Sequence, residues 1–202
     1  MKPVVLVTRK LPDSVEDRLR RDYTPILNPD DTLYTSEQII ERAKEADAIL
    51  PCHTEKFGAD VIARLPKRVR VIANFSVGYD HVDTAAAKAK GLIVTNTPEV
   101  LSDATAELTI MLMLGAARRA SEGERLVRTR EWKDWSPSFM VGTQMTGKRL
   151  GILGFGRVGR VVAKRARAFD MEIHYNDIKR VPPELEEGAV FHATTAVRAH
   201  AA

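Results

Sequence analysis

Residues Arg149–Asp177 read RLGILGFGRVGRVVAKRARAFDMEIHYND, and this stretch decides the fold. Its apolar start predicts a strand over Arg149–Leu153, which opens directly into a glycine-rich turn. A helix is expected over Arg160–Phe169, and a second strand over Glu172–Tyr175. Strand, turn, helix and strand in this order make a βαβ unit, which predicts a parallel sheet.

The turn itself is Gly154-Phe155-Gly156-Arg157-Val158-Gly159, a G-x-G-x-x-G pattern with an acidic residue about 20 residues further on. In a βαβ setting this pattern is typical of a dinucleotide site, because glycines permit the tight turn, the close approach of a pyrophosphate and tight helix packing. The helix N-terminus adds a partial positive charge for the anion. A glycine-rich turn without a ligand is the alternative. The predicted cofactor-binding residues are Gly154, Gly156, Arg157, Val158, Gly159 and Asp177.

The residues around Asp177 indicate which dinucleotide is bound. A carboxylate there accepts hydrogen bonds from the adenosine ribose and repels a 2′-phosphate, which favours NAD over NADP. Lys179 and Arg180 follow at once and suit a 2′-phosphate, although they are equally typical of a solvated loop. Asp170 ends the predicted helix, where we expect a left-handed backbone with a small local strain.

The first half of the chain alternates short apolar runs with helical patterns. This alternation predicts a parallel sheet covered on both faces, as in a flavodoxin-like domain. Pro98 breaks the pattern and predicts a boundary between a flavodoxin-like domain over residues 1–97 and an incomplete Rossmann domain over 98–202. The expected strands are Val4–Thr8, Pro25–Leu27, Ala48–Leu50, Val69–Asn74 and Leu92–Asn96, and the expected helices are Ser14–Arg21, a helix from Ser36, Ala59–Leu65 and Val82–Lys90.

Helix caps and a long apolar helix are the next local features. Ser36 is expected to cap its helix, and Ser102 or Asp103 to cap a helix that runs to Arg119. This last helix is apolar nearly all round, which predicts burial in a domain core or a subunit interface. The segment Glu122–Trp135 is charged and carries both tryptophans.

Composition narrows the class of protein. The chain has 202 residues, of which 44% are hydrophobic and 29% charged, as in a globular domain. The lone Cys52 indicates a reducing compartment, and we expect the cytoplasm. No apolar window is long enough to predict a membrane span. The net charge of +4 is mild, and arginines alternate with glutamates, which favours a solvated helical face over a nucleic-acid stripe at Arg118, Arg119, Arg125, Arg128 and Arg130.

Two small clusters of residues each have a structural and a chemical interpretation. Cys52 and His53 suggest a nucleophile pair, but neighbours in extended chain point to opposite faces, so a buried cysteine beside a loop histidine is favoured. Asp80, His81 and Asp83 suggest a metal site, but a helix N-cap beside a surface histidine is favoured because no further ligand has a useful spacing. No metal site is predicted.

Taken with the glycine-rich turn, three further motifs make the chain similar to the D-2-hydroxyacid dehydrogenase family, and most to its glyoxylate/hydroxypyruvate reductase branch. The resemblance runs from Val4 to about Phe191. The three motifs are Asn74-Phe75-Ser76-Val77-Gly78-Tyr79-Asp80-His81-Val82-Asp83, Asn96-Thr97-Pro98 with Asp103-Ala104-Thr105-Ala106-Glu107, and Glu131-Trp132-Lys133-Asp134-Trp135-Ser136-Pro137.

The resemblance implies a substrate domain over residues 1–97 and a set of roles. Val77 and Gly78 would offer backbone N–H groups to the carboxylate of a 2-keto or 2-hydroxy acid, although the two residues alone are equally typical of a turn. Thr105 would lie beside the nicotinamide. The helix Ser102–Arg119 would form a homodimer interface, with Trp135 reaching towards the partner's active site.

The family's catalytic residues are an arginine that binds substrate and a histidine general acid held by a glutamate. The resemblance puts all three in the second half of the nucleotide domain, which this sequence does not extend into. No catalytic residue is therefore assigned, and His192 and His200 match no catalytic position. We expect a truncated chain whose strand Arg149–Leu153 is an exposed edge and whose C-terminal part is marginally stable.

Three functions stay open from the sequence. The first is an NAD(P)-dependent oxidoreductase of 2-hydroxy acids, present here without its catalytic residues. The second is a non-catalytic NAD-binding interaction module. The third is a flavodoxin-like binding domain with a nonfunctional remnant attached. The sequence favours the first.

Overall fold

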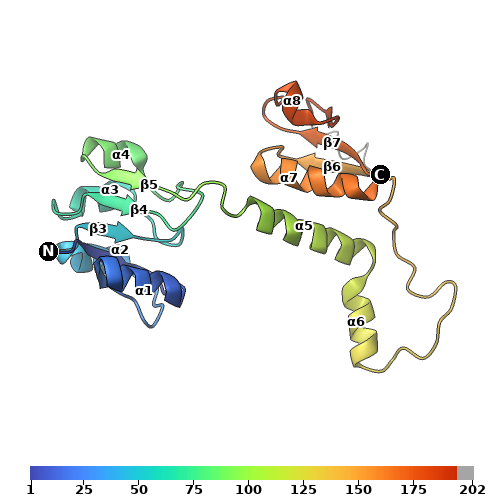
Figure 1. Cartoon of the computed structure of the whole chain (residues 1–202), viewed down its shortest axis with the longest axis horizontal. Coiled ribbons are helices and arrows are strands. Elements are labelled where there is room, and N and C mark those ends of the chain that lie inside the picture. The colour runs from blue at the N-terminus through green and yellow to red at the C-terminus, as the bar shows by residue number, and fades with distance from the viewer. Residues whose placement is uncertain (195–202) are drawn as a thin grey trace. The chain divides into compact units, whose positions relative to one another are not determined.

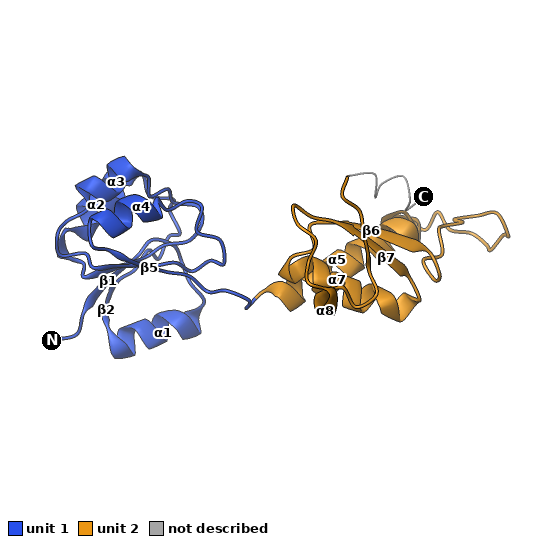
Figure 2. Ribbon diagram, turned by 90° about the horizontal axis from the view of Figure 1, so that it is seen from above, with its two compact units in different colours: residues 1–100 blue, residues 101–202 orange. Residues whose placement is uncertain are grey.

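The computed structural model describes residues 1–194, which form two compact units (Figures 1 and 2). The first unit is Met1–Val100, and the second begins at Leu101. The chain therefore divides after Val100, whereas the sequence indicated a boundary after Thr97. Residues 195–202, which include His200, lie outside the described residues.

The first unit is built on a five-stranded parallel sheet with strand order β2-β1-β3-β4-β5, which confirms the predicted parallel α/β class. Adjacent strands pair in register, as in Leu6 with Ile49 and Ile49 with Ile72. These three side chains are fully buried, since the sheet packs against helices. The strands are β1 (Val4–Val7), β2 (Thr24–Ile26), β3 (Ala48–Leu50), β4 (Val71–Ala73) and β5 (Ile93–Thr95).

Helices cover this sheet from both sides. Three lie on one face and α1 lies on the other (Figure 2). The three-helix face holds the larger core, which includes Phe57 and Ile62, whereas the α1 face holds a smaller one around Val7 and Leu19. The helices are α1 (Asp13–Asp22), α2 (Ser36–Arg42), which runs into a 3-10 turn over Ala43–Glu45, α3 (Ala59–Arg64) and α4 (Thr84–Ala89).

The helix caps differ from those that the sequence predicted. The cap of α2 is Thr35, which forms a reciprocal capping box with Gln38, so that Ser36 is already inside the helix. The helix that was expected to be capped by Ser102 or Asp103 has Leu101 at its N-cap and no capping side chain among the described residues. Helix α4 begins at Thr84 and not at Val82 as predicted, and its N-cap is Asp83, whose side chain accepts the N–H of Ala86 at 2.9 Å.

The second unit contains a three-stranded parallel sheet in the order β6-β7-β8. Within the described residues β6 is an edge strand, as predicted, and its last residue, Leu153, is 50% exposed. The core of this unit includes Phe155, Ala163 and Tyr175. Its elements are β6 (Arg149–Leu153), α7 (Arg157–Ala166) with a 3-10 turn over Arg167–Phe169, β7 (Glu172–Asn176), α8 (Pro183–Glu186) and β8 (Val190–Phe191).

Two further helices, α5 (Ser102–Ala117) and α6 (Ala120–Arg128), precede β6. The sequence predicted that α5 is buried, but Ala106 is its only buried residue, and Leu108, Met111 and Leu112 are 52–60% exposed. One side of α5 packs on the core of the second unit, and the apolar residues on the other side face solvent in this chain. Burial in the domain core was therefore wrong for this side.

The helix after the glycine-rich turn begins earlier than predicted. It starts at Arg157 and not at Arg160, because the chain turns into the helix at its N-cap, Gly156. At the other end, Asp170 adopts the expected left-handed conformation with φ 55°. Helix α7 thus directs its N-terminus at the carboxyl end of β6.

Candidate functional site

The glycine-rich turn between β6 and α7 contains three glycines with different physical constraints. Gly154 has φ +93°, a conformation that L side chains rarely adopt. A Cβ on Gly159 would lie 2.2 Å from the carbonyl oxygen of Gly154 and 3.3 Å from Ile152 Cγ2. A Cβ on Gly156 would meet nothing within 4 Å, and its φ is −70°. The fold itself therefore requires glycine at 154 and 159, whereas at 156 glycine leaves open space beside the backbone.

Asp177 holds the turn from the end of the neighbouring strand. Its Oδ2 accepts the backbone N–H of Phe155 at 2.7 Å, and its Oδ1 accepts the N–H of Ile178 at 2.7 Å. The backbone N–H of Gly154 also donates to Asn176 O at 2.8 Å. These contacts bring the carboxylate next to the glycine-rich turn at the carboxyl edge of the sheet, where α/β proteins bind ligands.

A cavity of about 390 Å³ opens beside this carboxylate. Its walls combine the turn, the loop after β7 and α8, and they include Phe155, Gly156, Asp177, Arg180 and Leu185. The size and the mixture of apolar walls with a few polar groups suit a small organic ligand. Together with the first turn of α7, whose backbone N–H groups have no partner within the helix, the region can hold a ring and a phosphate side by side.

An ion-pair cluster that the sequence did not reveal lies on one wall of the cavity. The Arg180 guanidinium donates to both carboxylate oxygens of Glu186, with Nε–Oε1 2.8 Å and Nη2–Oε2 2.9 Å. The hydroxyl of Tyr175 donates to Glu186 Oε1 at 2.6 Å. These contacts, Arg180 first, lower the pKa of Glu186 to about 2. Burial, together with the bond to Glu186, raises the pKa of Tyr175.

In the first unit, the loop that follows β4 has its carbonyl groups engaged by other parts of the chain. The N–H of Thr97 donates to Ser76 O at 2.9 Å, and Asn96 Nδ2 donates to Val77 O at 2.8 Å. The hydroxyl of Ser76 donates to Gly78 O at 2.6 Å. Among the described residues, no hydrogen bond uses the backbone N–H of Val77 or Gly78. The loop therefore presents two adjacent donors and no free carbonyl at the same turn, which suits an anion.

This loop is fixed at both ends. The N–H of Phe75 donates to Pro51 O at 2.8 Å, which ties the loop to the end of β3. Asn74, 3% exposed, donates to Thr95 O through both its backbone N–H and its side chain, each at 2.9 Å. His81 Nε2 lies 2.9 Å from Asn74 Oδ1, and burial lowers the pKa of His81. The sequence singled out Val77 and Gly78 but missed the two asparagines that orient them.

Of the remaining predicted site residues, Thr105, Trp135 and Arg157 are exposed, and Val158 is half-buried. Thr105 lies in the first turns of α5, where its carbonyl accepts the Thr109 hydroxyl at 2.8 Å. Trp135 is 74% exposed, and its backbone N–H donates to Asp134 Oδ1. Arg157 is the first residue of α7. The structure brings the glycine-rich turn and Asp177 together, and Val77 with Gly78 belongs to the other unit.

Two small clusters, Cys52-His53 and Asp80-His81-Asp83, each had a structural and a chemical interpretation in the sequence. Within residues 1–194 no group of three or more His, Cys, Asp or Glu residues could hold a metal ion. Cys52 is half-buried, and burial raises the pKa of its thiol, which disfavours a nucleophilic thiolate. His81 is half-buried and not a surface residue as expected, because it packs against Asn74. His192 pairs with His174, with ring nitrogens 2.9 Å apart.

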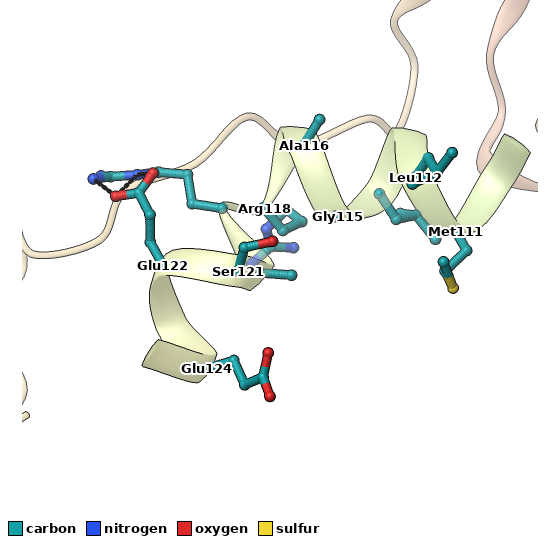
Figure 3. Close-up of a pocket in the computed structure, with 11 residues that line it drawn as sticks. Met111, Leu112, Gly115, Ala116, Arg118, Ser121, Glu122 and Glu124 are labelled. Carbon is teal, nitrogen blue, oxygen red and sulfur yellow. Dashed lines mark hydrogen bonds and ion pairs between the residues drawn. The ribbon is translucent and has the colours of Figure 1, made fainter. Parts of the chain in front are cut away.

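An open apolar groove of about 820 Å³ lies between α5 and α6 (Figure 3). Met111, Leu112 and Gly115 contribute from α5, and Ser121 and Glu124 from α6. Arginines on and beside α6 are paired with glutamates, as in Arg128 with Glu124 and Arg125 with Glu131, so this side is a solvated charged face as predicted. Met111 and Leu112, which line the groove, also belong to the exposed side of α5.

The chain matches the model of a known protein family. The model of the D-isomer specific 2-hydroxyacid dehydrogenase catalytic domain matches residues 5–201. The chain is 43% identical over 193 residues to the glycerate dehydrogenase of Hyphomicrobium methylovorum, covering 95% of this chain and 60% of that protein. Residues 1–194 contain no helix with the length and hydropathy of a membrane span.

Solved structures agree with this match. A D-isomer specific 2-hydroxyacid dehydrogenase, NAD-binding, from Polaromonas sp. JS6 66 superposes with a TM-score of 0.89 at 42% identity, over 96% of this chain and 61% of that one. An NADPH-dependent glyoxylate/hydroxypyruvate reductase from Sinorhizobium meliloti gives a TM-score of 0.78 at 27% identity, over 96% and 59%. The chain thus spans about 60% of the length of the relatives that it matches.

Proposed function

Because the chain belongs to the D-isomer specific 2-hydroxyacid dehydrogenase family, we propose that its residues form the nicotinamide-dinucleotide site and the substrate-carboxylate site of a glyoxylate/hydroxypyruvate reductase-like enzyme. The family consists of oxidoreductases that act on small 2-hydroxy and 2-keto acids. Residues 1–97 supply the substrate domain, and residues from 98 onward supply the cofactor domain. The single cysteine, which is half-buried, cannot form an internal disulfide and is typical of a protein in a reducing compartment. The proposed compartment is the cytoplasm.

The observation that carries the proposal is the open space at Gly156 beside the N-terminus of α7. The fold itself requires glycine at 154 and 159 but not at 156. Glycine at 156 is therefore explained by a ligand that approaches the backbone there. A pyrophosphate there meets the backbone N–H groups and the dipole of α7. Gly154, Arg157, Val158 and Gly159 complete this phosphate site.

The adenosine ribose is bound by Asp177, whose two oxygens keep lone pairs beyond the bonds to Phe155 and Ile178. A carboxylate in this place favours the free 2′-hydroxyl of NAD over the phosphate of NADP. Thr105 lies beside the nicotinamide, at the N-terminal end of α5. NAD is therefore the proposed cofactor, although the family also includes an NADPH-dependent enzyme.

The substrate carboxylate is bound by the backbone N–H groups of Val77 and Gly78. Two adjacent donors without a protein partner match the two oxygens of a carboxylate, and the engaged carbonyls of the loop leave no acceptor to repel it. When bound, a nicotinamide would supply the hydride chemistry for the reduction of a 2-keto acid.

Proton transfer is a separate requirement, since reduction of a 2-keto acid needs a general acid at the developing alkoxide. The described residues provide none in the family's arrangement, and His192 is bonded to His174. The 202 residues are thus proposed to bind cofactor without turnover on their own. A non-catalytic NAD-binding interaction module is the second candidate, favoured by the exposed apolar surface on α5 and α6.

The experiment is a fluorescence titration of NADH with the 202-residue chain, followed by assays with glyoxylate and hydroxypyruvate. We expect saturable binding and no turnover. Gly156→Val should abolish binding without unfolding the chain, because its side chain enters open space in the protein. Gly123→Val, on α6, is the matched control and should bind as the wild type does. Absence of NADH binding in the wild type would refute the cofactor site, and turnover by these residues alone would refute the absence of a proton donor.

A further inference from the structure

The cavity beside Asp177 has an arginine on its wall that is already committed to a partner. Arg180 lines the same cavity as Asp177, close to where a ribose 2′-substituent would lie if the site holds an adenine dinucleotide. A guanidinium in this position is well suited to bind a phosphate through two parallel N–H bonds. In this chain, however, Nε and Nη2 of Arg180 both donate to Glu186, at 2.8 and 2.9 Å.

The partner is itself fixed. Glu186 is only 7% exposed, and its Oε1 also accepts the hydroxyl of Tyr175 at 2.6 Å. Tyr175 is fully buried in the middle of the second unit's core and stacks on Phe155 with ring centroids 4.1 Å apart. The same hydroxyl accepts the backbone N–H of Val181 at 3.3 Å. The cluster therefore ties the loop after β7 to the sheet and to the glycine-rich turn.

Releasing Arg180 to meet a phosphate would be costly here. An exposed ion pair contributes little and exchanges partners readily. The carboxylate of Glu186 is buried, so loss of the arginine would leave a buried charge whose one remaining side-chain partner within residues 1–194 is the Tyr175 hydroxyl. Because its partner carboxylate is buried, Arg180 stays bound to Glu186 and does not exchange readily to another partner.

We propose that Glu186 is a specificity-determining positioning residue, which holds Arg180 away from the ribose 2′-position and so excludes NADP from the site. Asp177 acts on the ribose directly, and Glu186 acts through Arg180 without contact with the cofactor. This inference rests on the proposed function, because it requires that the cavity beside Asp177 receives the adenosine ribose.

The test compares dissociation constants for NADH and NADPH by fluorescence titration of the 202-residue chain. The wild type should prefer NADH. Glu186→Gln removes the charge that holds Arg180, and it should strengthen NADPH binding about tenfold, equivalent to about 1.4 kcal/mol. NADH binding should change by less than about twofold, within the scatter expected for a residue that does not touch the cofactor. The ratio of the two constants is the readout, because a merely structural defect would weaken both cofactors together.

Two further variants identify the arginine as the cause. Adding Arg180→Gln to Glu186→Gln should remove the NADPH gain. Glu184→Gln lies on the same helix, removes the same charge and has no contact with Arg180 among the described interactions, so it should leave the ratio at its wild-type value. If Glu186→Gln fails to fold by circular dichroism, Tyr175→Phe, which removes the 2.6 Å bond to Glu186 and the 3.3 Å bond from the Val181 N–H, should shift the ratio in the same direction by a smaller factor.

The outcomes separate the two proposals. An unchanged ratio in folded Glu186→Gln or Tyr175→Phe overturns the inference while NADH binding still supports the proposed cofactor site. A wild type that binds NADPH as tightly as NADH, or a gain that persists without Arg180, also overturns it. A wild type that binds neither cofactor overturns both.

Discussion

Two alanine substitutions in the glycine-rich turn should have opposite effects on stability. Gly159→Ala places a methyl group 2.2 Å from the Gly154 carbonyl oxygen, far inside the ~3.5 Å of an ordinary contact. Overpacking of this kind costs about 1–3 kcal/mol, and the clashing atom is backbone, which cannot rotate away. The gain from replacing glycine within a helix is at most about 1 kcal/mol, so the net change is destabilising.

Gly156→Ala has none of this cost. Its φ of −70° suits alanine, and the added methyl group meets no protein atom within 4 Å. The variant should be more stable than the wild type by about 0.4–1 kcal/mol, because the unfolded chain loses conformational freedom. It should nevertheless bind NADH about tenfold more weakly, since the methyl group occupies the space proposed for the pyrophosphate.

The assay is urea denaturation, with unfolding followed by circular dichroism and tryptophan fluorescence, together with NADH titration of each variant. The second unit is expected to unfold at lower urea than the first, and Gly159→Ala should lower the midpoint of the second unit's transition alone. Both variants shifting stability in one direction would contradict the steric reasoning. Gly156→Ala that binds NADH as tightly as the wild type would contradict the assignment of the open space to a ligand.

Four other results are expected. If the exposed side of α5 forms the proposed homodimer interface, Leu112→Glu should give a monomer in analytical ultracentrifugation, whereas Leu33→Glu, at a similarly exposed site in the first unit, should leave the oligomeric state unchanged; a wild-type monomer would refute the interface. Asn96→Ala removes the 2.8 Å bond to Val77 O and should destabilise the first unit by about 1 kcal/mol in urea, and this loss should stay the same when Gly159→Ala, which acts on the second unit, is also present. The pKa of Glu186 is depressed in the folded chain, so its contribution to stability is present above its ordinary pKa of 4.5 and is lost as pH falls towards about 2. Between these two pH values, the denaturation midpoint should fall more steeply in the wild type than in Glu186→Gln. Parallel curves for the two proteins would contradict the stabilising role of the Glu186 ion pair. Asn28 is 2% exposed and donates to Thr8 O and Thr32 O at 2.8 and 2.7 Å, so Asn28→Ala should cost about 1–3 kcal/mol of stability in the same urea assay, with no effect on NADH binding.

Local patterns in the sequence were sufficient for much of the fold. The alternation of apolar runs and helical segments predicted the parallel sheets, and the spacing of Gly154, Gly156 and Gly159 predicted a turn whose steric demands the structure reproduces. Asp170 was identifiable because a helix end often requires a left-handed residue. These features depend on residues close together in the chain, where short-range rules apply.

Features that depend on tertiary contacts were less accessible. The cap of α2 is a separate case, because it is local: Gln38 lies three residues after Thr35 and completes a capping box with it, whereas Ser36 has Ile39 at that spacing. The apolar pattern of α5 predicts burial but does not say against what, and only one side of the helix has a partner in this chain.

The candidate site shows the same division. Sequence motifs indicated Val77, Gly78 and Asp177, but not the groups that orient them. Asn96 acts on Val77 from the end of the neighbouring strand, and Glu186 reaches Arg180 from the four-residue helix α8. Such pairs join segments whose mutual placement depends on the whole unit, so no spacing rule identifies them.

The loop that follows β4 has an electrical polarity. The carbonyl oxygens of Ser76, Val77 and Gly78 all accept hydrogen bonds from the chain, so the negative ends of these peptide dipoles are held in fixed directions. The backbone N–H groups of Val77 and Gly78, which have no partner among the described residues, are thereby fixed before any ligand binds. Such a loop attracts acids and rejects amines of the same shape, and little ordering entropy is lost when the acid binds. Esters and amides of the same acids, which lack the negative charge, should therefore be poor ligands.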